Sequence, residues 1–210
     1  MIKLITGLLV VMALALPVGS SAQEVAPDAL AKKVTDEVIA VLRADKDIQA
    51  GNTKKVLDLV ESKVLPHFNF ARMTRLAVGA SWRQASDAQK QTLSTEFRTL
   101  LVHTYTSAFT QYRDQVIEYR PLKVAPGDAE VVVRSLIKQK TGADPIDINY
   151  SMEKTDAGWK VYDVVIAGVS LVQNYRSSFA SEIQKGGVDG LIATLSAKNK
   201  TLAQQQVTKK

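Results

Sequence analysis

Residues 159–183 read WKVYDVVIAGVSLVQNYRSSFASEI, and the structural period changes within this stretch. Residues 159–166 are dense in β-branched and aromatic side chains, which is typical of a buried strand. After Gly168 the apolar residues recur at helical spacing, at Leu171, Val172, Tyr175, Phe179 and Ile183. Gly168 permits a turn that other residues resist, and Ser170 is suited to an N-cap. The stretch predicts a strand that leads into an amphipathic helix, at one corner of a core or a cavity.

Three further strand patterns precede this stretch. Residues 116–119, 130–140 and 146–154 favour strands, and turn signals rich in Gly, Pro and Asp separate them. In the third, apolar residues alternate with polar ones, so one face is expected to meet water. Because short turns join consecutive strands, we expect an antiparallel meander of four strands, including residues 159–166.

Helical patterns occupy most of the remaining chain. Amphipathic spacing predicts helices near residues 30–43, 53–64 and 71–78, and a last one at 188–195. The longest pattern opens with a capping box formed by Ser86 and Gln89, and its apolar stripe continues to Tyr112. Helices, then a one-sided antiparallel sheet, then helices predict an α+β fold.

The N-terminus indicates export. A basic residue, an apolar run and a small-residue site predict a signal peptide over residues 1–22, with an uncleaved anchor as the alternative. Residues 23–197 then form a single α+β domain, and the polar, Gln-rich residues 198–210 are expected to be a disordered tail. The chain has no Cys, so packing alone must stabilise it. We infer a periplasmic location, although the signal would also allow full secretion.

The formal net charge of +6 restricts the possible partners. An exported protein rarely meets nucleic acid, so we expect no nucleic-acid partner. Anionic lipid headgroups or an acidic protein are better candidates. A basic surface that serves solubility alone is an equal alternative.

No catalytic or metal motif is evident. The two histidines, His67 and His103, lie far apart and outside any recognisable triad. Without Cys and without paired carboxylate motifs, they do not indicate a zinc site. We therefore expect no enzyme activity, no catalytic residues, no metal and no cofactor.

Several of these segments together resemble a known family. Residues 159–164, Gly168-Val169-Ser170, Asn174-Tyr175-Arg176 with Phe179, and Leu191-Ile192 are similar to the C-terminal half of the MlaC family of toluene-tolerance auxiliary proteins. Residues 68–73, Gly79 with Trp82, and 97–101 followed by Thr104-Tyr105 are similar to its helical half. The resemblance spans about Lys33 to Leu195. Ala167 departs from the family pattern, in which an acidic residue is expected.

The resemblance implies a periplasmic phospholipid carrier with a nuclear-transport-factor-like fold around an apolar pocket. Its cargo would be a phospholipid, and its partners an inner-membrane ABC lipid transporter and an outer-membrane lipoprotein-porin complex, together maintaining outer-membrane lipid asymmetry. A non-catalytic envelope adaptor with a filled core, or a carrier of another apolar molecule, fits the same sequence.

On this basis we expect the acyl chains to contact one long helix and the apolar face of the sheet, at Phe97, Leu101, Tyr105, Phe109, Val133, Ile148, Tyr150, Val164, Ile166 and Val169. Basic residues around the loop after Pro66, and one on the helix after Ser170, are expected to contact headgroups or partners: Arg72, Arg75, Arg83 and Arg176. Ordinary core positions and a solvated surface are the respective alternatives.

Overall fold

The computed structural model describes residues 25–110, 115–139, 142 and 144–208. The expected signal peptide and Tyr112 lie outside the described residues. Within the described ranges, no helix combines the length and apolar character that a membrane span requires.

The five strands form one antiparallel sheet in the order β1-β2-β3-β4-β5. Their bounds are β1 (Val116–Tyr119), β2 (Glu130–Lys138), β3 (Ile146–Thr155), β4 (Gly158–Ile166) and β5 (Val169–Ser170). The predicted meander is confirmed, but the prediction of four strands is wrong. Ala167 and Gly168 both have positive φ, +48° and +83°, as in the tight turns that connect hairpins. The chain therefore reverses at once, and β5 pairs with the end of β4.

A bulge in β4 alters which of its side chains face the helices. Ser151 pairs with Asp163 but Met152 pairs with Val161, so Tyr162 is an extra residue without a partner in β3. An extra residue changes the in-and-out alternation of a strand. Consequently Val161 before the bulge and Val164 after it both face the interior, where they line the same cavity.

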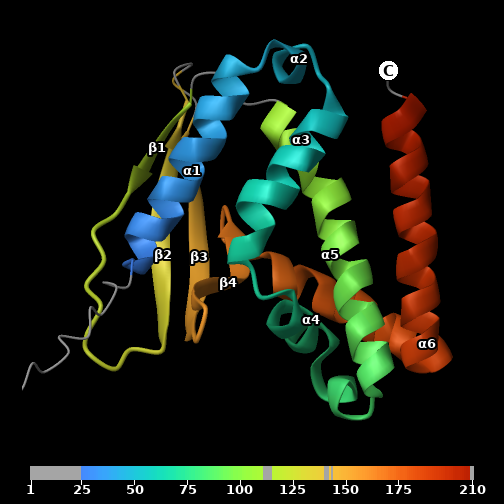
Figure 1. The fold of residues 1–210 in the computed structure, drawn as a ribbon. Helices are drawn as coiled ribbons and strands as arrows, with labels where there is room; N and C mark the ends of the chain where they lie inside the picture. The colour runs from blue at the N-terminus through green and yellow to red at the C-terminus, as the bar shows by residue number, and fades with distance from the viewer. Residues whose placement is uncertain (1–24, 111–114, 140–141, 143, 209–210) are drawn as a thin grey trace, which may run out of the picture.

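The helices before the sheet lie on its apolar side, with α1 crossing in front of it and α3 and α5 beyond (Figure 1). They are α1 (Pro27–Ala44), α2 (Lys46–Gln49), α3 (Thr53–Leu59), the π-helical turn η1 (Val60–Val64), the 3₁₀ turn η2 (Leu65–His67), α4 (Phe70–Val78), the 3₁₀ turn η3 (Gly79–Arg83) and α5 (Asp87–Thr110).

Local side-chain bonds fix where these helices begin. The predicted capping box is present, because the Gln89 amide nitrogen donates to Ser86 Oγ at 3.2 Å and the Ser86 amide donates to Gln89 Oε1 at 2.9 Å. At the starts of α3 and α4, the side chains of Asn52 and Asn69 each accept a hydrogen bond from a backbone amide of the first turn. Such caps satisfy amide groups that a helix leaves unpaired at its start.

The last helix, α6 (Leu171–Thr208), is broken at Gly186 and Gly187, whose backbone angles are not helical. Its first half lies at the bottom of Figure 1 and its second half runs up beside α5. Ser170 Oγ accepts from the Gln173 amide at 3.0 Å, so the predicted N-cap is confirmed.

The prediction of a disordered tail is wrong for residues 198–208, which continue α6. Asn199 is buried, and its Nδ2 donates to the carbonyl oxygen of Glu96 at 2.9 Å and to Glu96 Oε2 at 2.7 Å. Leu202 packs against the core formed by α4, α5 and α6. These contacts join the polar tail to α5, a tertiary effect that composition does not report.

Candidate functional site

A cavity of about 360 Å³ lies between the sheet and the helices that cover it. Its wall is formed by residues from helices and turns before the sheet, from each of the first four strands and from the start of the last helix: α1, η1, η2, α4, α5, β1, β2, β3, β4 and α6. Its described lining contains no Asp, Glu, Lys or Arg, and most of its side chains are aliphatic or aromatic. Such a wall suits an apolar ligand, because few groups in it would lose hydrogen bonds to water.

Seven of the ten residues expected to contact acyl chains line this cavity. Three belong to α5, two to β3 and two to β4: Leu101, Tyr105, Phe109, Ile148, Tyr150, Val164 and Ile166. Residues more than 40 positions apart in the sequence thus meet at one apolar surface.

The other three residues lie outside the cavity wall. Phe97 is fully buried on the other side of α5, where its ring centroid is 5.1 Å from that of Tyr175 and 5.1 Å from that of Phe179. Val133 is fully buried in the cluster on the sheet, and Val169 in β5 is 55% exposed. Periodicity identified Phe97 and Val133 as inward-facing residues, but it does not distinguish a filled core from a cavity.

The helix α1 also contributes to the wall, which was not predicted from the sequence. Residues from four successive turns of this helix line the cavity: Leu30, Ala31, Val34, Thr35, Val38, Ile39 and Leu42. Phe68, Phe70 and Met73, around the start of α4, also contribute to the wall. The amphipathic stripe of α1 was visible in the sequence, but no sequence signal shows which element faces it.

Hydroxyl groups connect α1 to the sheet beside the cavity. The Tyr119 hydroxyl lies 2.7 Å from Thr35 Oγ1 and donates to the carbonyl oxygen of Ala31 at 3.2 Å. Nearby, Ser135 Oγ donates to the carbonyl oxygen of Ile148 at 2.9 Å. Burial raises the pKa of Tyr119 and of Tyr150. Both phenols therefore remain neutral hydrogen-bonding groups at physiological pH.

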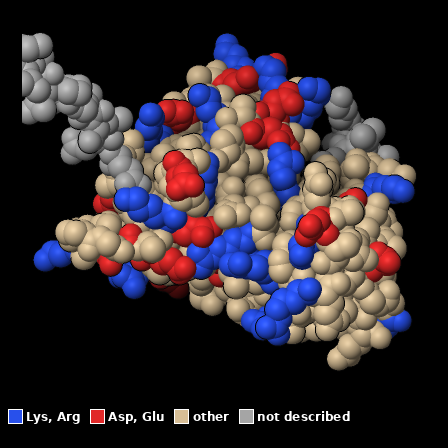
Figure 2. All heavy atoms as spheres, turned by 60° about the horizontal axis from the view of Figure 1, so that its bottom comes forward, with Lys and Arg blue, Asp and Glu red and all other residues tan. Residues whose placement is uncertain are grey.

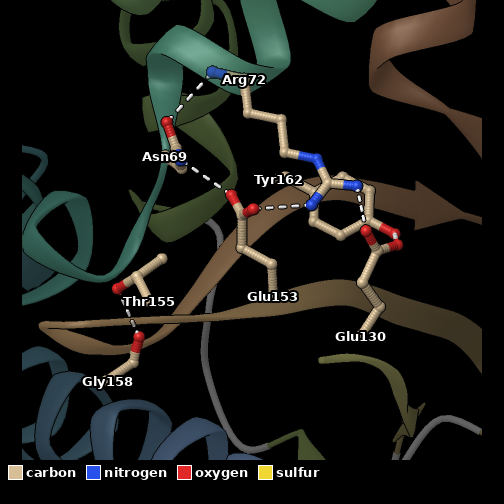
Figure 3. A network of polar contacts seen from close by, with 7 residues as sticks. All are labelled: Asn69, Arg72, Glu130, Glu153, Thr155, Gly158 and Tyr162. Carbon is tan, nitrogen blue, oxygen red and sulfur yellow. Dashed lines mark hydrogen bonds and ion pairs between the residues drawn. The ribbon is translucent and has the colours of Figure 1, made fainter. Parts of the chain in front are cut away.

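Arg72 lies at the centre of a polar network that joins α4 to the sheet (Figure 3). Its Nη1 donates to Glu153 Oε2 at 2.6 Å and its Nη2 to Glu130 Oε1 at 2.6 Å. Asn69 Nδ2 donates to Glu153 Oε1 at 2.7 Å, and the Tyr162 hydroxyl donates to Glu130 Oε2 at 2.8 Å. The guanidinium carbon lies 3.6 Å from the centroid of the Tyr162 ring, a cation–π contact.

The electrostatics of this network are internally balanced. Burial lowers the pKa of Arg72, but its hydrogen bonds to the carboxylates of Glu153 and Glu130 outweigh this effect, and the pKa is raised. The hydrogen bond from Arg72, followed by that from Tyr162, lowers the pKa of Glu130. Since the Arg72 side chain is only 16% exposed and contacts two carboxylates, its charge serves the fold rather than a free surface.

The other three arginines singled out from the sequence are exposed. Arg75 lies on α4, Arg83 ends η3 and Arg176 lies on the first half of α6. The Arg176 guanidinium lies over Gly79, where an added Cβ would be 3.6 Å from its Nη2. Figure 2 shows the lower face of the molecule, on which several basic side chains gather near the centre.

The described residues include no group of three or more His, Cys, Asp or Glu side chains that could hold a metal ion. The cavity wall likewise contains no described pair of acidic and basic groups for proton transfer.

The sequence profile of the family described as "MlaC protein" matches residues 32–197. A Haemophilus influenzae protein named "Intermembrane phospholipid transport system binding protein MlaC" is 25% identical over 174 residues, covering 82% of this chain and 81% of the relative. The "Toluene tolerance protein ttg2D" of Pseudomonas putida is 25% identical over 184 residues, covering 87% of this chain and 84% of the relative.

Among solved structures, the phospholipid-binding protein of Ralstonia solanacearum in complex with a phospholipid is similar to this chain. The TM-score is 0.77 at 39% identity, and the match covers 84% of this chain and 98% of that protein. The family profile matches well over half of the chain, and the relatives and the solved structure agree with it, so the chain belongs to the MlaC family.

Proposed function

We propose that this protein is a periplasmic phospholipid carrier of the Mla transport system. It takes up a phospholipid at one membrane complex, shields the acyl chains during transit and releases the lipid at another. The observation that carries the proposal is the apolar lining of the cavity, whose described residues include no Asp, Glu, Lys or Arg. Membership of the MlaC family and the lipid-bound Ralstonia solanacearum relative support it.

Seven residues are proposed to contact the acyl chains together with the inner face of α1: Leu101, Tyr105, Phe109, Ile148, Tyr150, Val164 and Ile166. A sheet covered by helices around such a space corresponds to a nuclear-transport-factor-like arrangement. The phosphate stays at the mouth, since desolvating it without a partner costs several kcal/mol.

The energetics suit a carrier rather than a trap. Burying a methylene group contributes roughly 0.8 kcal/mol relative to water, so two tails of about 30 carbons would gain on the order of 20 kcal/mol. Inside a bilayer the tails are already removed from water. Transfer between bilayer and cavity is therefore close to neutral, and the direction of transport is set by the partners.

The proposed partners are an inner-membrane ABC lipid transporter and an outer-membrane lipoprotein-porin complex, whose joint action maintains outer-membrane lipid asymmetry. Arg75, Arg83 and Arg176 are proposed to contact them, since their guanidinium groups lie on the surface. Arg72 contributes indirectly, by holding α4 against the sheet. The protein acts without catalysis, and its only ligand is the lipid cargo.

Lipid extraction tests this function. The protein is purified from the periplasm of cells with intact membranes, extracted with organic solvent and analysed by mass spectrometry. We expect phospholipid in near-stoichiometric amount. Protein that contains a quinone or another apolar molecule in place of phospholipid, or no lipid at all, would contradict the proposal.

A further inference from the structure

His67 differs from every other described residue in the wall of the cavity. It ends η2, and it is the one described lining residue that can carry a positive charge near neutral pH. The remaining titratable groups in the wall are the phenols of Tyr105 and Tyr150. A single histidine in an otherwise uncharged lining marks the place where a charged part of a ligand can be accommodated.

Charged groups of β4 and α1 act on this histidine. Lys160 of β4 donates from Nζ to the carbonyl oxygen of Pro66, the preceding residue, at 2.6 Å. Lys33 and Glu37, one turn apart on α1, act electrostatically on the imidazole. On η1, Lys63 Nζ lies 3.4 Å from Glu37 Oε2. Because Lys63 pairs with Glu37, the charges of Lys33 and Lys160 are in excess near His67, and the local charge is positive.

Exposed residues flank this part of the cavity wall. Leu65, His67 and Phe68 line the cavity, whereas Pro66 is exposed. The side chains of Lys63 and Glu37 are 49% and 43% exposed, and Lys33 is exposed. A ligand whose tails occupy the cavity and whose charged group reaches water would pass His67.

The imidazole itself is available to a ligand. Burial, followed by the charge of Lys160, lowers the pKa of His67, so in the empty protein the ring is mostly neutral at neutral pH. None of the described residues forms a hydrogen bond with the ring. A phosphate oxygen placed there would accept hydrogen bonds from the imidazole and from the lysines.

We propose that His67, with Lys33 and Lys160, forms a site for the phosphate group of an anionic lipid headgroup. The inference rests on the proposed function, because it assigns the charged end of the same cargo. It also assigns a preference. The headgroup of phosphatidylglycerol brings only its negative phosphate to Lys33 and Lys160, whereas that of phosphatidylethanolamine would add an ammonium of the same sign as these lysines.

The site also makes the preference dependent on pH. The bound phosphate stabilises the protonated imidazole, so anionic lipid binds more tightly once His67 is protonated. The preference for phosphatidylglycerol should therefore rise as the pH falls from about 8 to about 6, the range in which an imidazole takes up its proton, and His67 should account for the rise.

Competition between two lipids tests the site. Lipid-free protein is incubated with vesicles of equal phosphatidylglycerol and phosphatidylethanolamine content and re-isolated, and both lipids are quantified by mass spectrometry. Total lipid per mole of protein is measured alongside the ratio, for the wild type and for the His67→Gln variant. The variant's ratio of phosphatidylglycerol to phosphatidylethanolamine should be about two- to fivefold lower at about pH 6, the range that an exposed charge pair contributes.

Two variants provide the controls. Lys33→Gln, on the exposed face of α1, should lower the ratio in the same direction and replaces the His67 variant if that one does not fold. Lys54→Gln removes a lysine of α3 that is 80% exposed and paired with Asp58, and it should leave the ratio unchanged. An equal decrease in all three variants would attribute the preference to net charge and overturn the site.

Total lipid and the lipid ratio separate the two proposals. A wild type that binds no lipid refutes the carrier function itself. A wild type and a His67→Gln variant with equal ratios at both pH values refute the headgroup site alone. The imidazole resonance of His67 is also followed in lipid-free protein as each ligand is added. If inorganic phosphate shifts this resonance as strongly as phosphatidylglycerol does, the site binds free phosphate and the lipid assignment is overturned.

Discussion

The two sides of α5 are packed differently, although one continuous helix supplies both. Toward α6, Phe97, Leu93 and Leu100 are almost completely buried, and the Phe97 ring meets two aromatic rings edge to face. Toward α1 and the sheet, Leu101, Tyr105 and Phe109 border a cavity of about 360 Å³. Similar side chains thus build a filled core on one side and a binding space on the other.

The difference lies in the facing elements. The first half of α6 packs directly against α5, and its Phe179 ring centroid lies 5.1 Å from that of Phe97. On the other side α5 and α1 line the same cavity, and α1 is joined to the sheet at Tyr119 by hydroxyl contacts. No large side chain from α1 fills the space, since its wall residues are aliphatic or small. What faces a helix therefore decides whether its apolar stripe becomes core or cavity.

Truncation of Phe97 should give the largest effect. Phe97→Ala leaves a void in a close-packed region, so we expect the free energy of unfolding to fall by about 3–5 kcal/mol. Urea unfolding followed by circular dichroism measures this change. Phe109→Ala is the matched control, because it enlarges a space that already exists and should cost well under half as much. Equal losses would mean that the two sides are packed alike.

Removal of Arg72 should give an intermediate effect. Arg72→Met keeps much of the side-chain volume but leaves Glu130 and Glu153 without their shared cation, at an expected cost of about 1–3 kcal/mol. Thermal unfolding measures the loss. Lys54→Met removes an exposed cation of α3 and should change stability little. An Arg72 variant as stable as this control would show that the network does not hold α4 to the sheet.

A substitution in the turn between β4 and β5 should give the smallest effect, and it should raise the stability of the protein. Ala167 has φ +48°, a left-handed conformation that is costly for a residue with a Cβ. Ala167→Gly relieves this cost and should raise the stability by about 0.5–1 kcal/mol after the entropy of the glycine is included. A lower melting temperature than that of the wild type would contradict this interpretation of the turn.

Local chemistry made much of the fold predictable. Ser86 and Gln89 identified the start of α5, Gly168 identified the turn after β4, and the alternation in residues 146–154 identified a strand. Each of these signals depends on residues that are close in the sequence, and each is confirmed.

The unpredicted features depend on contacts between distant residues. The bulge at Tyr162 moves Val164 to the same side as Val161, but it depends on pairing with β3. The helical tail depends on Asn199 reaching Glu96. Phe97 and Tyr105 lie on the same helix with the same apolar pattern, so only their neighbours reveal that one is core and the other lines the cavity.

The central claim, that the space beside α5 holds a phospholipid while the opposite side is solid core, can be tested by filling each side. Ala31 lines the cavity, whereas Ala77 is fully buried in the core of α4, α5 and α6. Phospholipid per mole of protein, measured by extraction and mass spectrometry, is compared for Ala31→Trp and the wild type, with Ala77→Trp as the overpacking control.

The account predicts that Ala31→Trp folds and carries much less phospholipid than the wild type, while Ala77→Trp is strongly destabilised. A folded Ala31→Trp variant that still carries the full wild-type amount of phospholipid would contradict it, because the lipid would then be bound elsewhere.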